Sequence, residues 1–141
     1  MTWLFYAILA AITAALSTIF TKIGVSNLSP SLAGTIKAII MALFFIGVSS
    51  FRGDFSSAGD LLTHKKDLIY LGLTGVCGAL SWLCMNIALK HGKVTQVAPI
   101  DKLSVVLTVL VAVVFLKETL SIKAMVGVIM IGVGSILVAL F

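Results

Sequence analysis

Five apolar stretches, each long enough to cross a lipid bilayer, occupy almost all of the 141 residues. A helix needs about 20 mainly apolar residues to span the hydrocarbon core. Only 11% of the residues are charged and 60% are hydrophobic, whereas an ordinary soluble domain has about 25% charged residues. The chain is therefore predicted to be an all-α membrane protein, a single five-helix domain over residues 1–141 with spans at about 3–21, 32–50, 68–89, 95–116 and 124–140.

Charge and cysteine content narrow the function classes. The net charge of +5 comes mostly from basic residues that flank or interrupt the apolar stretches, where they act as topology signals or headgroup contacts. No basic patch is interleaved with exposed aromatic residues, so nucleic acid is not an expected partner. Cys77 and Cys84 lie seven positions apart on one predicted helix, which is too far for a mutual disulfide, and we expect both to be small buried side chains.

Three charged residues fall inside the predicted spans, where an ionised group costs roughly 2.5–3.5 kcal/mol at the bilayer centre. Lys37 lies about six residues into the second span, and Asp101 and Lys102 lie about six into the fourth, which places all three about 9 Å deep. Both spans start from the same side of the membrane. We therefore predict a hydrated transport pathway at this level; snorkelling to headgroups is the alternative for the two lysines.

The predicted substrate contacts come from the second, third and fourth spans. Lys37 and Asp101 can pair if the second and fourth spans are neighbours, whereas successive helix residues point about 100° apart, which argues against an Asp101–Lys102 pair. Helical spacing places the hydroxyls of Ser104 and Thr108 on the face of Asp101. On the third span, the bulky Trp82 and the polar Asn86 extend a stripe of small residues. The predicted substrate-binding residues are Lys37, Trp82, Asn86, Asp101, Ser104 and Thr108.

Asp101 is also the only carboxylate inside a predicted span, so it is the candidate for proton coupling. Pro99 precedes it, and opening of the helix there would free backbone carbonyls for a ligand. No set of His, Cys and carboxylate residues has ligand spacing, and no nucleophile has a base beside it. We therefore predict no metal site, no cofactor and no enzymatic activity.

The connections carry the signals of helix ends. Ser29 and Ser121 are expected to cap the helices that follow them, Pro30 suits a first helical turn, and Gly92 is placed as a C-terminal cap. The longest connection, residues 51–67, is polar and glycine-containing and is predicted to be solvated, with His64 as a surface residue among charges.

These residues resemble a single EamA domain of the drug/metabolite transporter superfamily, most of all its five-span bacterial and archaeal members. The resemblance is carried by QVAPIDKLS at 96–104, FLKETLS at 115–121, GVIMIGVG at 127–134 and the basic Lys37 early in the second span. It implies secondary transport of a small metabolite or export of an amphiphile, in the inner membrane of a bacterium or archaeon. It also implies that the chain is half of a ten-helix, inverted-repeat transporter.

A lone five-span chain must obtain its inverted partner from another molecule, because alternating access is commonly built from two repeats of opposite orientation. Lysine and arginine residues give only a weak orientation bias between the two sides. One side carries Arg52, Lys65, Lys66, Lys117 and Lys123, and the other carries Lys22, Lys90 and Lys93. We therefore predict an antiparallel homodimer, or a heterodimer with a related five-span chain.

The leading hypothesis is a secondary transporter or flippase in the lipid bilayer that takes a small-molecule substrate. A cation exporter of the small four-span type is disfavoured, because the first span has no acidic residue. The alternative is a membrane subunit or scaffold with no transport cycle of its own, whose polar groups serve helix packing.

Overall fold

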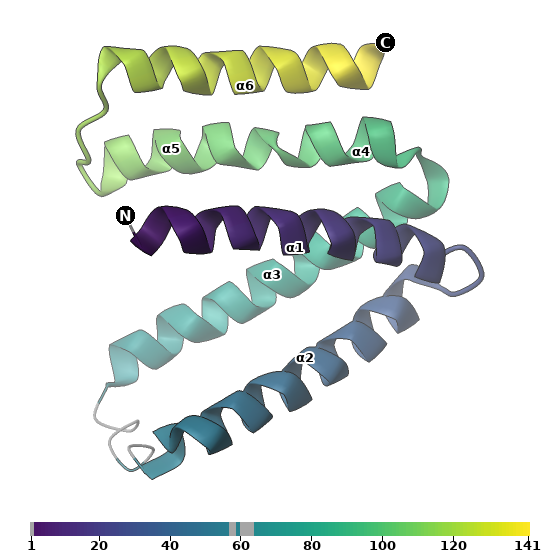
Figure 1. The fold of residues 1–141 in the computed structure, drawn as a ribbon, viewed down its shortest axis with the longest axis vertical. Coiled ribbons are helices and arrows are strands. Elements are labelled where there is room, and N and C mark those ends of the chain that lie inside the picture. The colour runs from purple at the N-terminus through teal and green to yellow at the C-terminus, as the bar shows by residue number, and fades with distance from the viewer. Residues whose placement is uncertain (1, 57–58, 60–63) are drawn as a thin grey trace. The chain divides into compact units, whose positions relative to one another are not determined.

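The computed structural model describes residues 2–56, 59 and 64–141, and its described part contains helices and no strand. Five helical segments are long and apolar enough to cross a membrane, and they match the five predicted spans. The fourth of these segments consists of two shorter helices. The helices are α1 Thr2–Gly24, α2 Pro30–Arg52, α3 Lys65–His91, α4 Val94–Asp101, α5 Leu103–Phe115 and α6 Ile122–Leu140 (Figure 1).

Most of the predicted helix ends are confirmed. The Ser29 hydroxyl accepts a bond from the backbone N–H of Leu32 at 3.3 Å, directly before Pro30 in the first turn of α2. The Ser121 hydroxyl accepts from the N–H of Ala124 at 3.2 Å at the start of α6. α3 ends at His91, directly before Gly92, as predicted. Within the described residues, the glycine with a left-handed backbone is Gly53, with φ 72°, at the end of α2. A left-handed residue closes the last helical turn with little strain only when it lacks a Cβ.

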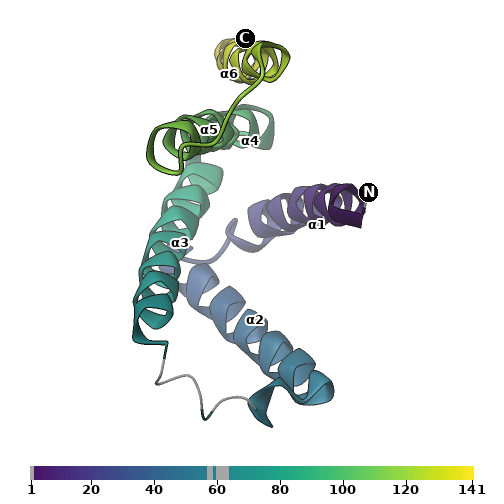
Figure 2. The same ribbon diagram turned by 90° about the vertical axis from the view of Figure 1, so that its left-hand side faces the viewer.

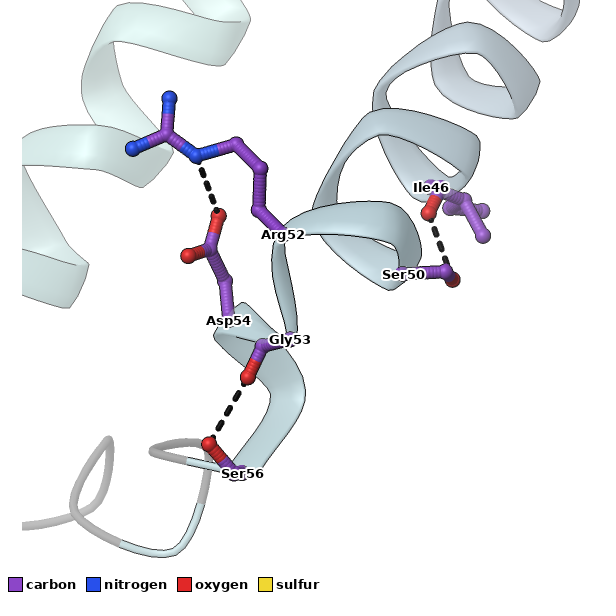
Figure 3. Close-up of polar contacts among 6 residues, drawn as sticks. All are labelled: Ile46, Ser50, Arg52, Gly53, Asp54 and Ser56. Atoms are coloured by element: carbon purple, nitrogen blue, oxygen red, sulfur yellow. Dashed lines mark hydrogen bonds and ion pairs between the residues drawn. The ribbon is translucent and has the colours of Figure 1, made fainter.

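The connection after α2 is polar and exposed, as predicted, in the part that the structure describes. Arg52 Nε lies 3.6 Å from Asp54 Oδ2, and the Ser56 hydroxyl donates to the Gly53 carbonyl at 2.8 Å (Figure 3). His64 Nδ1 lies 3.6 Å from Asp67 Oδ2, and both side chains are exposed. Residues 57–58 and 60–63, which belong to the same predicted loop, lie outside the described residues.

The chain divides into two compact units, of which the first contains Met1–Lys22 and His91–Phe141. In it α6 runs alongside α4 and α5 (Figures 1 and 2), and Gly132 of α6 faces Val106 of α5. A Cβ added at Gly132 would lie 3.4 Å from the Val106 side chain. Glycine therefore permits close approach of the two helices, as small residues do in membranes.

The second unit, Ile23–Lys90, contains α2 and α3, which meet where Asn86 of α3 bonds to the first turn of α2. Among its described residues, the buried side chains are Val25, Asn86 and Leu89. Lys90 Nζ donates to the Leu28 carbonyl of the connection between α1 and α2 at 3.0 Å. Hydrogen bonds thus hold α2 and α3 together at one end, and the two helices diverge toward the other end (Figure 2).

Few side chains are buried within the described chain, and most large apolar side chains are exposed. Cys77 and Cys84 are also exposed and unpaired, so the prediction that both are buried was wrong. Three glycines, Gly72 and Gly75 of α3 and Gly127 of α6, would have no atom within 4 Å of an added Cβ. These faces are free for lipid or for another protein chain, because a bilayer, unlike water, does not oppose their exposure.

Candidate functional site

Asn86 joins α3 to the first turn of α2. Its side chain is 2% exposed, and Nδ2 donates to the Pro30 carbonyl at 3.1 Å. A Cβ on Gly34 would lie 3.4 Å from the same nitrogen, so glycine allows the amide to approach the α2 backbone. The amide donor bonds to a helix that spans the membrane, where unpaired polar groups are costly. Asn86 therefore acts first as a positioning residue, and its contact with a substrate stays a prediction.

A groove of about 660 Å³ lies between α2 and α3. Small and apolar side chains form most of its walls, and its polar side-chain groups are three hydroxyls and one indole N–H. The lining residues on α2 are Ser31, Gly34, Thr35, Ala38, Met41, Ala42 and Phe45, and those on α3 are Thr74, Gly75, Gly78, Ala79, Trp82 and Leu83. This volume is within the range of small-molecule sites, which are commonly about 300–1,000 Å³.

Lys37 and Trp82, both predicted as substrate contacts, meet at the flank of this groove. Lys37 Nζ lies 4.9 Å from the centroid of the Trp82 ring. This distance is within the range of cation–π attraction, which is stronger when the ammonium group is desolvated. Both side chains are half-buried. The ammonium group therefore lies against the ring of Trp82, which lines the groove, while Lys37 itself stands beside the lining residues.

The fourth span is interrupted in its first half. α4 ends at Asp101, α5 begins at Leu103, and Lys102 between them has φ −70° and ψ −12°. Pro99 has no backbone N–H, so it cannot donate to the carbonyl of Thr95 in the preceding turn. The N–H of Lys102 bonds instead to the Pro99 carbonyl, three residues back, at 3.0 Å. The predicted opening that would free backbone carbonyls for a ligand stays a prediction.

The prediction that Asp101 and Lys102 do not pair was wrong. Lys102 Nζ lies 3.4 Å from Asp101 Oδ2, with both side chains partly exposed. The prediction assumed a continuous helix, in which successive side chains diverge by about 100°. Lys102 keeps right-handed helical dihedral angles, so the pair forms because the long, flexible lysine side chain turns back to the carboxylate.

Ser104 and Thr108 follow this interruption on α5. The Thr108 hydroxyl donates to the Ser104 carbonyl, one turn earlier, at 2.7 Å, so it satisfies its own helix. Both residues are exposed, whereas Val106 on another face packs on α6. The face that carries Ser104 and Thr108 is thus left open by α6.

The structure brings together Lys37, Trp82 and Asn86 in the α2–α3 unit. Asp101 and Thr108 belong to the other unit, so the predicted Lys37–Asp101 pair stays a prediction. Sequence reasoning missed the α2 wall of the groove. Its signal was present, because Ser31, Thr35, Ala38 and Ala42 recur every three or four residues and give α2 a small, weakly polar face.

Comparison with known proteins identifies relatives over nearly the whole chain. The profile of the EamA-like transporter family matches residues 1–140. A Sinorhizobium protein described as an uncharacterized transporter is 32% identical over 139 residues, which cover 99% of this chain and 97% of the relative. An uncharacterized protein of Methanocaldococcus jannaschii is 32% identical over 80 residues, which cover 57% of this chain and 58% of the relative. No solved structure gives a significant match. This multi-pass membrane protein, with its five apolar spans, therefore belongs to the EamA-like transporter family.

Proposed function

We propose that the protein is a secondary transporter that moves a small metabolite or amphiphile across the membrane by alternating access. Its supporting observation is the Asp101–Lys102 ion pair inside the fourth span, at the tight helical turn that follows Pro99. Charged groups inside a span cost roughly 2.5–3.5 kcal/mol each near the bilayer centre. Ionisable residues inside spans usually face the interior of the helix bundle or a water-filled cavity, and they often mark substrate or proton pathways.

In this proposal each helix pair contributes part of the pathway. Lys37, Trp82 and Asn86 would form one wall, while Asp101, Ser104 and Thr108 would form the other. Asp101 would carry the coupling proton, since its carboxylate lies seven residues after the first residue of α4 and has only Lys102 as a charged neighbour among the described residues. No enzymatic reaction is proposed for any of these residues.

We further propose that two five-helix chains of opposite orientation form the working transporter. The chain holds one repeat, and the Sinorhizobium relative, which it covers to 97%, has nearly the same length. Inverted repeats around a midplane site are the usual basis of alternating access. The partner would be a second copy or a related five-span chain, and the membrane would be the inner membrane of a bacterium or archaeon, since the relatives come from such organisms.

Transport by the purified protein tests the proposal. A thermal-shift screen against a metabolite library selects ligands, and their flux is then measured in proteoliposomes with an imposed pH gradient. Asp101→Asn should abolish coupled flux while the protein remains folded and assembled. The matched control is Asp54→Asn, since Asp54 is an exposed carboxylate in the connection after α2. Flux that is equal in the Asp101 and Asp54 variants would contradict the carboxylate role, and a protein that moves no solute would indicate a scaffold.

Orientation is tested by reporter fusions at Phe141. Reporters that are active on each side of the membrane are expected for a chain that inserts both ways. A C-terminus on one side only, with no related chain co-purifying, would exclude the antiparallel dimer without affecting the transport result.

A further inference from the structure

The α2–α3 groove has a definite chemical character. Its walls are mostly apolar and small, and the polar groups among its lining residues are the hydroxyls of Ser31, Thr35 and Thr74 and the indole N–H of Trp82. Such a surface suits an alkyl or acyl chain, because burial of apolar area is the non-directional part of ligand binding. It offers few polar groups for a sugar or a peptide, whose many donors and acceptors would need partners.

The charge beside this groove has one sign. Lys37 is the only charged side chain of the unit within residues 31–50 and 68–89, and no carboxylate lies in either segment. An organic cation would therefore be repelled there, and it would also compete with Lys37 for the face of the Trp82 ring. An anionic group would be attracted.

The present partner of Lys37 leaves it able to bind an anion. The ammonium group contacts the Trp82 ring at 4.9 Å, and an aromatic face satisfies an ammonium less well than a carboxylate or phosphate, which forms a charge-assisted hydrogen bond. Because the lysine stem has four flexible carbons, the ammonium can leave the ring for an anion at the mouth of the groove.

We propose that the groove binds a single-chain anionic amphiphile, with its carboxylate or phosphate on Lys37 and its chain along Ala38, Ala42 and Gly78. The inference rests on the proposed transport function and names the substrate class of that pathway. A groove of about 660 Å³ is of the size that small-molecule ligands occupy. We therefore commit to a single-chain amphiphile rather than a two-chain bilayer lipid.

Trp82 supplies the probe for a binding test. The chain has two tryptophans, so Trp3→Phe leaves Trp82 as the only one. The full chain is placed in neutral phosphatidylcholine nanodiscs and titrated with 11-bromoundecanoate or with a brominated trimethylammonium amphiphile of the same chain length. Bromine quenches tryptophan fluorescence on contact. The anion should quench Trp82 saturably and at about tenfold lower concentration than the cation, a factor that corresponds to about 1.4 kcal/mol.

Two pairs of variants assign the effect to the groove. Lys37→Met should remove the preference for the anion and Lys37→Arg should retain it, whereas Lys93→Met, which removes an exposed charge at the start of α4, should leave it unchanged. Gly78→Leu should weaken saturable quenching about tenfold, because its side chain fills the groove, while Gly72→Leu, outside the lining, should not. Neither glycine has an atom within 4 Å of an added Cβ, so both variants should fold.

Each other outcome overturns the proposal. Equal quenching by the two probes, or an anion preference that survives Lys37→Met, would exclude recognition by Lys37. Absence of quenching would show that a protein helix covers the groove, and non-saturable quenching would show an open lipid surface. Loss of the signal on addition of phosphatidylglycerol would identify a bilayer lipid as the occupant. The quenching test measures binding alone. Binding without flux would contradict the transport proposal only, and flux without binding would contradict this inference only.

Discussion

Replacement of Asn86 by alanine should loosen the α2–α3 pair. The variant removes a buried 3.1 Å hydrogen bond to the Pro30 carbonyl. Interhelical hydrogen bonds in membranes are worth about 0.6 kcal/mol on average and up to about 1.7 kcal/mol. Truncation also removes the packing of a side chain that is 2% exposed. We therefore expect a total loss of about 1–2.5 kcal/mol in the free energy of unfolding.

The assay is unfolding in mixed micelles with increasing dodecyl sulfate, followed by circular dichroism. Asn27→Ala is the matched control, because Asn27 is exposed in the connection before α2, and it should change the free energy of unfolding by less than about 0.5 kcal/mol.

A double-mutant cycle locates the effect. A Cβ on Gly34 lies 3.4 Å from Asn86 Nδ2, so Gly34→Leu should destabilise the wild-type protein more than the Asn86→Ala variant, by about 0.5 kcal/mol or more. Additive effects of the two changes, or Asn86→Ala equal to Asn27→Ala, would refute the view that this contact holds the two helices together.

Two further predictions concern the other unit. Pro99→Ala supplies the N–H that proline lacks and should favour the helical conformation of the fourth span by up to about 3 kcal/mol. Amide hydrogen exchange around Lys102 should therefore slow. Unchanged exchange would show that Pro99 is not the cause of the irregular turn between α4 and α5. Gly132→Leu should push α6 away from Val106 and lower the free energy of unfolding by about 1–3 kcal/mol through overpacking. Gly127→Leu should be nearly neutral, because an added Cβ there meets open space. Equal effects of the two variants on thermal unfolding in detergent would contradict the packing described.

The spans and most helix ends could be predicted because their signals are local. Apolar length determines a span, and a serine hydroxyl at the right position caps a helix whatever lies around it. Ser29 and Ser121 behave in this way. Depth in the second span selected Lys37, and position on the small-residue stripe of the third span selected Trp82; the two side chains do meet.

The failures arose where a contact depends on how two backbones meet or on how far a flexible side chain reaches. The Asp101–Lys102 pair was rejected on the directions of successive side chains in a helix, but the lysine side chain is long enough to turn back to the carboxylate. The burial of Asn86 depends on the close approach of α3 to Gly34, which a single helix pattern does not specify. The α2 wall of the groove was missed because a stripe of hydroxyl and alanine side chains carries no charge to single it out from an ordinary packing face.

The central claim is that polar side chains of the spans line a water-filled pathway, and cysteine reactivity on α5 tests it most directly. In a background with Cys77 and Cys84 replaced by alanine, Ser104→Cys and Val105→Cys place a thiol at nearly equal depth on different faces of one helix. Only a hydrated thiol forms the reactive thiolate. The account predicts that a charged, membrane-impermeant methanethiosulfonate modifies position 104 about tenfold or more faster than position 105. Equal, slow modification of both would contradict it.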